Sequence, residues 1–327
     1  MKHRILALSR PLLAIGLLVF LFQRIGLEQL ALVLDSLNPG YFVLLFGLLL
    51  LDNVCRAFSW RALLGIRNQP IPFRDAVYNY IVGGFFGTFL PSSLGSDASR
   101  ALLVSRRNQV GVQDSLLAML VLNLMGLLAL CIVGLGGVAL AVLLAVDSPI
   151  TGLMALLCVC YILLFAVMLK GWIPQGWLSV EDSIGSSRRH RVFHRIREFS
   201  RALLAFRHHR ATMATVLGVF LGNQLMAILT VYTVSLALDI RLSPWLFVIY
   251  VPMITLSRLI PFSIAGLGGE QGVFVYLFGQ AGVPAAEAFL ISLILSVSNL
   301  GFCLLGGGLF ALDSGSQLWR QTRRPGY

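Results

Sequence analysis

The sequence predicts an all-α polytopic membrane protein with six full spans and two re-entrant helical hairpins arranged as inverted-topology repeats. The 327 residues are 57% hydrophobic and 12% charged, with a mean hydropathy of +0.85. Soluble domains carry about a quarter charged residues, so the chain belongs in a bilayer as one membrane domain, 1–327. Several uncharged runs also exceed the roughly 20 residues needed to cross. Finally, two apolar stretches are interrupted by prolines, glycines and ions.

Basic residues at the ends of the apolar runs set the predicted orientation, because cytoplasmic loops carry an excess of Lys and Arg. The basic residues within 2–10 and 320–324 place both termini in the cytoplasm. Between these ends the predicted spans alternate in direction and comprise residues 5–22, 41–62, 115–146, 150–169, 211–238 and 288–312.

The two interrupted stretches are predicted to be hairpins that turn back inside the membrane. Residues 75–105 lie between Arg74 and Arg106, so both ends of this hairpin are cytoplasmic. Residues 244–279 have weakly charged flanks and are expected to dip in from the outer face. Non-helical backbone at membrane depth is tolerated only where protein or a water-filled cavity satisfies its polar groups, so each hairpin should line a polar site.

The order of spans and hairpins predicts an internal symmetry. The first half, 1–149, and the second, 150–312, are mirror images in their sequence of crossings. Such inverted repeats are typical of transporters, whose sites lie near the bilayer midplane at the repeat interface.

A basic segment separates two spans of the second half. Residues 188–210 contain eight arginines and the single acid Glu198, and their apolar residues recur every three or four positions. This pattern predicts an interfacial helix that binds anionic lipids of the inner leaflet. Nucleic acid is not an expected partner, because DNA offers nothing to cover the apolar stripe.

The first hairpin holds a group of candidate substrate-binding residues. We expect Ser96 to cap the returning half-helix, whose N–H groups would then face an anion such as a lipid phosphate. Asp97 is a candidate ammonium partner or proton carrier and Arg100 a phosphate partner, although the two could simply satisfy each other. The candidates in this hairpin are Ser92, Ser93, Gly95, Ser96, Asp97 and Arg100.

The second hairpin places the ionisable Glu270 at membrane depth, where desolvation costs roughly 3 kcal/mol or more. Arg258 is its nearest partner in the sequence, and two interpretations stay open: a substrate site, or an ion pair that pins the hairpin. The candidates here are Arg258, Ser263, Gly266, Gly268, Gly269, Glu270 and Gln271.

Two polar groups fall within the predicted full spans. Asp52 and Arg56 are four residues apart and share a helix face with Trp60, so they either line the substrate path or fix helix packing. A second set is interpreted as residues that form hydrogen bonds between helices, namely Asn123, Asn223, Gln224 and Asn299.

Both hairpins resemble a known family. The run F-L-P-S-S-L-G-S-D-A-S-R from Phe89 and the run P-F-S-I-A-G-L-G-G-E-Q-G-V-F from Pro261 resemble the two signatures of the lysylphosphatidylglycerol synthase transmembrane, or flippase-like, family. The similarity extends over 5–312 and implies a bacterial inner-membrane protein that handles lipids, here a stand-alone member without the soluble aminoacyltransferase domain. Glu270-Gln271 departs from the usual Arg-Glu, and Ser96 replaces a usual glycine.

These observations together predict a lipid flippase or scramblase that moves a phospholipid or a polyprenyl-phosphate-linked lipid through a cavity between the hairpins. Two alternatives remain: a non-transporting accessory subunit for a lipid-modifying or glycosyl-transferring enzyme, and a carrier for a small soluble anion. We expect no enzyme activity, cofactor or metal, because every histidine lies in basic sequence outside the spans and no glycine loop precedes Lys-Ser/Thr. Further candidate partners are a separate lipid-synthesising enzyme and a second copy of the chain.

Overall fold

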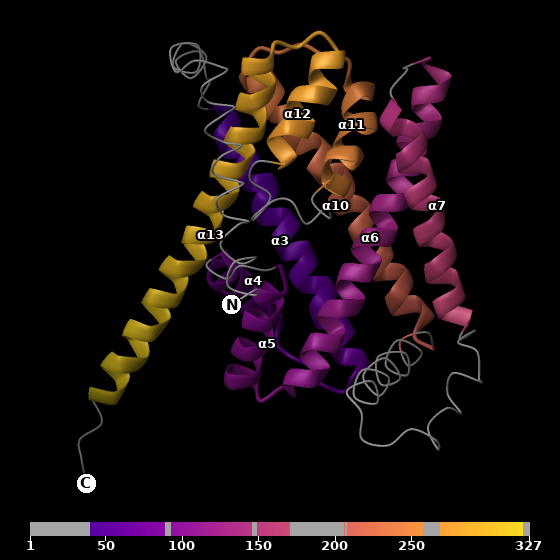
Figure 1. The fold of residues 1–327 in the computed structure, drawn as a ribbon. Coiled ribbons are helices and arrows are strands. Elements are labelled where there is room, and N and C mark those ends of the chain that lie inside the picture. The colour runs from indigo at the N-terminus through magenta and orange to yellow at the C-terminus, as the bar shows by residue number, and fades with distance from the viewer. Residues whose placement is uncertain are drawn as a thin grey trace, which may run out of the picture.

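The computed structural model of the chain describes residues 40–88, 93–145, 149–170, 206, 208–257 and 269–322. Within these ranges the chain is helical and contains no strand. Five of the described helices are long, and they are α3 (Gly40–Ile66), α6 (Val112–Leu143), α7 (Pro149–Lys170), α10 (Arg210–Ala237) and α13 (Ala285–Thr322) (Figure 1). Four are short, and they are α4 (Phe73–Thr88), α5 (Ser93–Asn108), α11 (Pro244–Ser257) and α12 (Gly269–Gln280).

Four of the described helices are long and apolar enough to cross a membrane, so the chain is a multi-pass membrane protein. They are α3, α6, α10 and the part of α13 from Ala285 to Asp313. Each coincides with a predicted span, and α7 covers the predicted span 150–169 with a shorter apolar stretch, Thr151–Val167. Helix α6 runs unbroken through its three glycines at 134–137. The predicted span 5–22 and the basic helix at 188–210 lie essentially outside the described residues.

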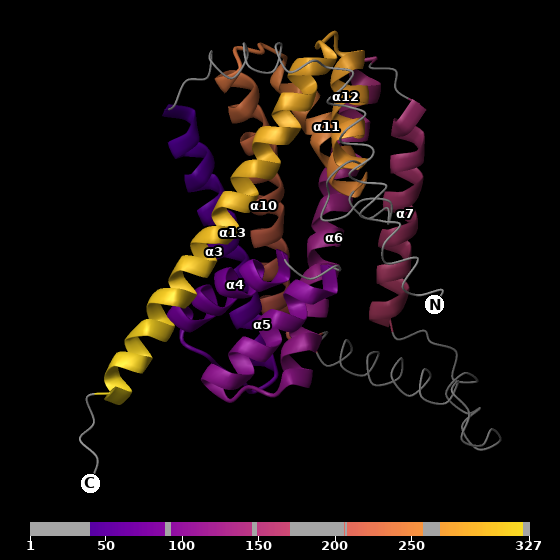
Figure 2. The ribbon, with the colours of Figure 1, turned by 60° about the vertical axis from the view of Figure 1, so that its left-hand side comes forward.

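The short helices occur in the two stretches that the sequence marks as hairpins. Helices α4 and α5 have 16 residues each, and at 1.5 Å per residue they reach only about 24 Å of the roughly 30 Å hydrocarbon layer. Helices α11 and α12 are shorter still, with 14 and 12 residues. The α4–α5 pair and the α11–α12 pair lie toward opposite ends of the helix bundle (Figures 1 and 2). Pro91 and Pro261, in the two connections, lie outside the described residues.

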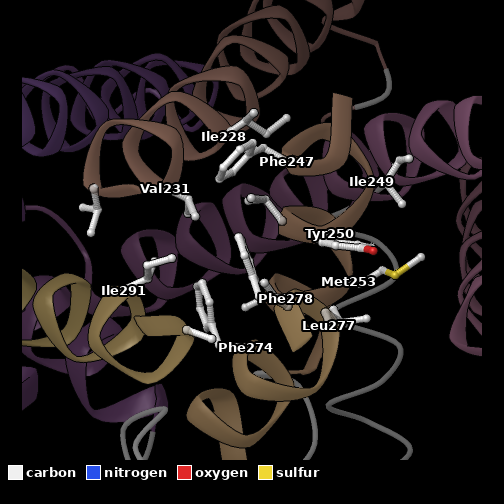
Figure 3. Close-up of a cluster of buried hydrophobic side chains, with 14 of the residues drawn as sticks. Ile228, Val231, Phe247, Ile249, Tyr250, Met253, Phe274, Leu277, Phe278 and Ile291 are labelled. Atoms are coloured by element: carbon white, nitrogen blue, oxygen red, sulfur yellow. The ribbon is translucent and has the colours of Figure 1, made fainter. Parts of the chain in front are cut away.

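Each helix pair has its own apolar core. The first core surrounds α4 and contains Trp60 of α3, Met119 of α6 and Phe220 of α10 among its buried side chains. The second core surrounds α11 and α12, where the ring of Phe278 lies 5.6–5.8 Å from the rings of Phe247, Tyr250 and Phe274 (Figure 3). Because the long helices α3, α6 and α10 contribute to both cores, they hold the two pairs in one bundle.

Glycines on α4 and α13 allow these helices to approach their neighbours closely. A Cβ atom added to Gly87 of α4 would overlap Ser96 of α5, and one added to Gly306 of α13 would lie 2.6 Å from the carbonyl oxygen of Ile81 on α4. Helix α4 is therefore packed tightly between α5 and the second half of α13.

Candidate functional site

Polar side chains occupy the interval between the two cores. On α3, Leu45 belongs to the second core and Ala57 to the first, with Asp52 and Arg56 between them. On α10, Asn223 and Gln224 likewise fall between residues of the first and second cores. We call this interval the polar layer. It lies midway along α3 and α10, and the predicted site at the bilayer midplane stays a prediction.

The predicted pair Asp97 and Arg100 forms an ion pair on α5. Its N–O distance is 3.2 Å, and each side chain is 13% exposed. The guanidinium of Arg100 also lies 3.8 Å from the centre of the Tyr80 ring on α4, and its Nε donates to the Tyr80 carbonyl at 3.2 Å. The other oxygen of Asp97 accepts a 2.7 Å hydrogen bond from Asn123 of α6. Asn123 thus forms the interhelical hydrogen bond predicted for it.

The second predicted pair, Asp52 and Arg56, forms on α3. The Nε of Arg56 donates to Asp52 at 2.8 Å, and Arg56 is 37% exposed. The Arg56 guanidinium also lies 5.6 Å from the centre of the Phe220 ring and interacts with the side chain of Tyr80. Because Arg100 stacks on the same tyrosine, Tyr80 joins the two ion pairs.

Tyr80 was not among the residues predicted from the sequence. It lies on α4, and Gly83, Gly84 and Gly87 follow it by three, four and seven residues. At these spacings the three glycines share a helix face with the Tyr80 ring. That face admits the Arg100 side chain, since a Cβ atom at Gly83 would overlap Arg100. The same spacing, read from the sequence, is the signal that could have identified Tyr80.

The predicted helix cap at Ser96 is wrong. Helix α5 begins at Ser93, so Ser96 lies inside the first turn with its Cβ against Gly87. The physical reason is the position of Pro91: proline disfavours helix in the residue before it but is tolerated at a helix start, so α5 can begin soon after Pro91. Gly95 is buried in the same turn. Ser93 starts the helix, and Ser92 lies outside the described residues.

The second hairpin is described from Gly269 onward. Glu270 is 7% exposed in the first turn of α12, where the helix dipole favours a negative charge. Gln271 is fully buried, and its Nε2 donates to Ser296 of α13 at 3.3 Å. The candidates Arg258, Ser263, Gly266 and Gly268 lie outside the described residues, so the Arg258–Glu270 pair stays a prediction.

The starts of α5 and α12 face the middle of the bundle from opposite ends. Helix α5 runs outward from Ser93 to the end where Arg107 meets Asp313, and α12 runs outward to the turn that leads into α13 (Figures 1 and 2). Exposed N–H groups at helix starts attract anions, so both helices direct partial positive charge toward the polar layer.

A separate ionic cluster lies where α4 begins and α5 ends, away from the middle of the bundle. Arg107 binds Asp75 at 3.4 Å and Asp313 at 2.8 Å, and the Tyr78 hydroxyl donates to Asp313 at 3.0 Å. These partners of Arg107 were not predicted from the sequence. The cluster ties the first hairpin to α13.

Comparison with known proteins identifies the family of the chain. No curated protein matches it. The family model of the lysylphosphatidylglycerol synthase TM region matches residues 6–307, a range that contains every candidate site residue. The chain therefore belongs to the lysylphosphatidylglycerol synthase TM region family.

Proposed function

We propose that this protein is a flippase or scramblase that carries a phosphate-containing lipid headgroup through the polar layer while the acyl chains stay in the bilayer. Its family is that of a membrane region associated with lipid metabolism, which supports a lipid substrate. The observation that carries the proposal is that two ion pairs, Asp52–Arg56 and Asp97–Arg100, meet at Tyr80 of the first core.

The cost of burying charge supports a functional role for these pairs. Each ionised side chain near the centre of a bilayer costs about 3 kcal/mol or more, and such residues usually line a substrate path. A lipid headgroup needs this polar environment to cross, since its phosphate cannot enter hydrocarbon unpaired.

Arg56 is the phosphate ligand in this proposal, in place of the Arg100 that the sequence favours. Arg100 is held by Asp97, by the Tyr80 carbonyl and by the Tyr80 ring, and it is 13% exposed. Arg56 binds Asp52 through Nε and also contacts Phe220 and Tyr80, but its side chain is 37% exposed against 13% for Arg100. It is therefore the more accessible of the two arginines for a phosphate oxygen. Arg100 then acts as a positioning residue for Tyr80 and Asp97.

Transport would proceed by movement of one half of the chain against the other, which opens the polar layer to each leaflet in turn. The protein would lie in a bacterial inner membrane with both termini in the cytoplasm. Such a cycle makes and breaks no covalent bond, so the protein would act as a transporter and not as an enzyme.

The test is reconstitution of the full chain in liposomes that contain phospholipid with a fluorescent acyl chain. A membrane-impermeant quencher then reports movement between leaflets. We expect movement above that in empty vesicles for the wild type and for the matched control Arg241→Gln, whose side chain is 84% exposed. The double variant Asp52→Asn/Arg56→Gln, which removes both charges together, should move lipid at least tenfold more slowly than the wild type.

Equal rates in wild-type, double-variant and empty vesicles would contradict the proposal. Uptake of a labelled soluble anion without lipid movement would instead favour the small-anion carrier. Neither activity, together with co-purification of a lipid-modifying enzyme, would favour the accessory subunit.

A further inference from the structure

Asn223 on α10 is the most completely buried amide in the polar layer. The residue is 1% exposed, and neither its Nδ2 nor its Oδ1 has a hydrogen-bond partner among the described residues. The prediction that it bonds to a neighbouring helix, which holds for Asn123, is therefore wrong for Asn223 in the part of the chain that the structure describes.

Asn223 lies within one helix turn of the Arg56 subsite. Arg56 of α3 lies over the ring of Phe220 on α10, and Asn223 follows Phe220 by three residues, so both share one face of α10. Helices α3 and α10 run in opposite directions, so Asn223 and Asp52 lie on the same side of the Arg56–Phe220 contact (Figure 1). One turn is about 5 Å, which a single lipid headgroup can bridge.

The unmade bonds of Asn223 carry a free-energy cost that a ligand would relieve. Each buried polar atom without a partner costs roughly the desolvation of that group, and native proteins leave few such atoms without a functional or structural reason. The amide offers two donors at nitrogen and an acceptor at oxygen. A ligand that presents an acceptor and a donor side by side would satisfy both ends.

We propose that Asn223 selects the headgroup, favouring lipids whose headgroup carries an N–H or O–H donor over lipids with a quaternary ammonium. This inference rests on the proposed function. With the phosphate on Arg56, Nδ2 of Asn223 donates to a headgroup oxygen and Oδ1 accepts from the headgroup N–H or O–H. A trimethylammonium group has no such hydrogen, so it leaves Oδ1 unpaired, and sites built around a polar contact reject analogues that lack it.

The access to Asn223 follows from the transport cycle. In the state described here the amide is sealed, so a headgroup reaches it only when the two halves separate. Selection then acts during transport, and its readout is a ratio of transport rates.

The experiment compares two labelled lipids of the same net charge, phosphatidylethanolamine and phosphatidylcholine, in liposomes that contain the full chain. We expect the wild type to move the ethanolamine lipid about threefold to tenfold faster, the range that one hydrogen bond supplies. Asn223→Leu, which keeps the branched shape of the side chain but removes its polar atoms, should lower this ratio to about one. The matched control is Asn53→Leu, because the Asn53 amide donates to Leu49 of its own helix at 2.8 Å.

A thermal unfolding measurement separates selection from misfolding. Asn223→Leu removes an unpaired buried amide, so its unfolding temperature should equal or exceed that of the wild type. A wild type that moves both lipids equally, or an Asn223→Leu variant that keeps the wild-type ratio, overturns the role of Asn223 while the proposed function stands. A wild type that moves neither lipid faster than empty vesicles overturns the proposed function itself.

Discussion

Arg107 of α5 binds Asp313 of α13 through Nη1 and Oδ2 at 2.8 Å, across 206 residues of sequence. The contact joins α5, in the predicted first repeat, to α13, the helix that contains the end of the predicted second repeat. Transport by movement of one half against the other would have to shift or break it. The pair is thus as relevant to mechanism as to stability.

Asp313→Ala should lower the unfolding temperature of the detergent-purified protein. The substitution removes one partner of Arg107 and the acceptor of the Tyr78 hydroxyl, and for a partly exposed pair of this kind we expect a loss of about 1 kcal/mol. Arg241→Gln is the control, because Arg241 is 84% exposed and pairs with Asp239 two residues away. Equal unfolding temperatures for both variants would mean that the Arg107 cluster contributes nothing measurable.

Gly306→Ala should be destabilising, whereas Gly308→Ala should not. The new Cβ at Gly306 would lie 2.6 Å from the Ile81 carbonyl and would push α13 away from α4, at a cost of about 1–3 kcal/mol. At Gly308 nothing lies within 4 Å, so alanine should be neutral or stabilise the helix by up to about 1 kcal/mol. Thermal unfolding of the two single variants provides the comparison, and a lower temperature for Gly308→Ala than for Gly306→Ala would be inconsistent with the packing described.

Tyr80→Leu should reduce lipid movement more than Tyr80→Phe. Phenylalanine keeps a ring beneath the Arg100 guanidinium, whereas leucine removes the cation–π contact, which is worth about 0.5–2 kcal/mol. We expect Tyr80→Leu to transport lipid about tenfold more slowly than the wild type. Tyr80→Phe should fall in between, because it loses the hydroxyl but not the ring. If both variants transport at the wild-type rate, Tyr80 does not couple the two ion pairs.

The long helices and the two ion pairs could be predicted because their signals are local. Long apolar runs give α3, α6, α10 and α13 directly. The four-residue spacing gives the Asp52–Arg56 contact. The Asp97–Arg100 contact follows from one helix turn in the same way.

The contacts between distant helices could not be predicted from one sequence. Stacking of Arg100 on Tyr80 depends on how α4 and α5 pack. The Arg107–Asp313 pair depends on how α13 packs against α4 and α5. Likewise, the sequence does not show whether a polar side chain in a span finds a hydrogen-bond partner. Asn123 and Asn223 were therefore interpreted in the same way, but among the described residues only Asn123 forms the predicted hydrogen bond.

The most direct test of the account places the headgroup itself. A phospholipid with a photoreactive group on its headgroup is reconstituted with the full chain, irradiated, and the modified residues are mapped by mass spectrometry. The account predicts labels around Arg56, Asn223 and the other polar-layer residues and around Tyr80 and Asp97 beside them, and these labels should decrease when unlabelled lipid is added. Labels confined to residues at the two ends of the bundle, with none in the polar layer, would contradict it.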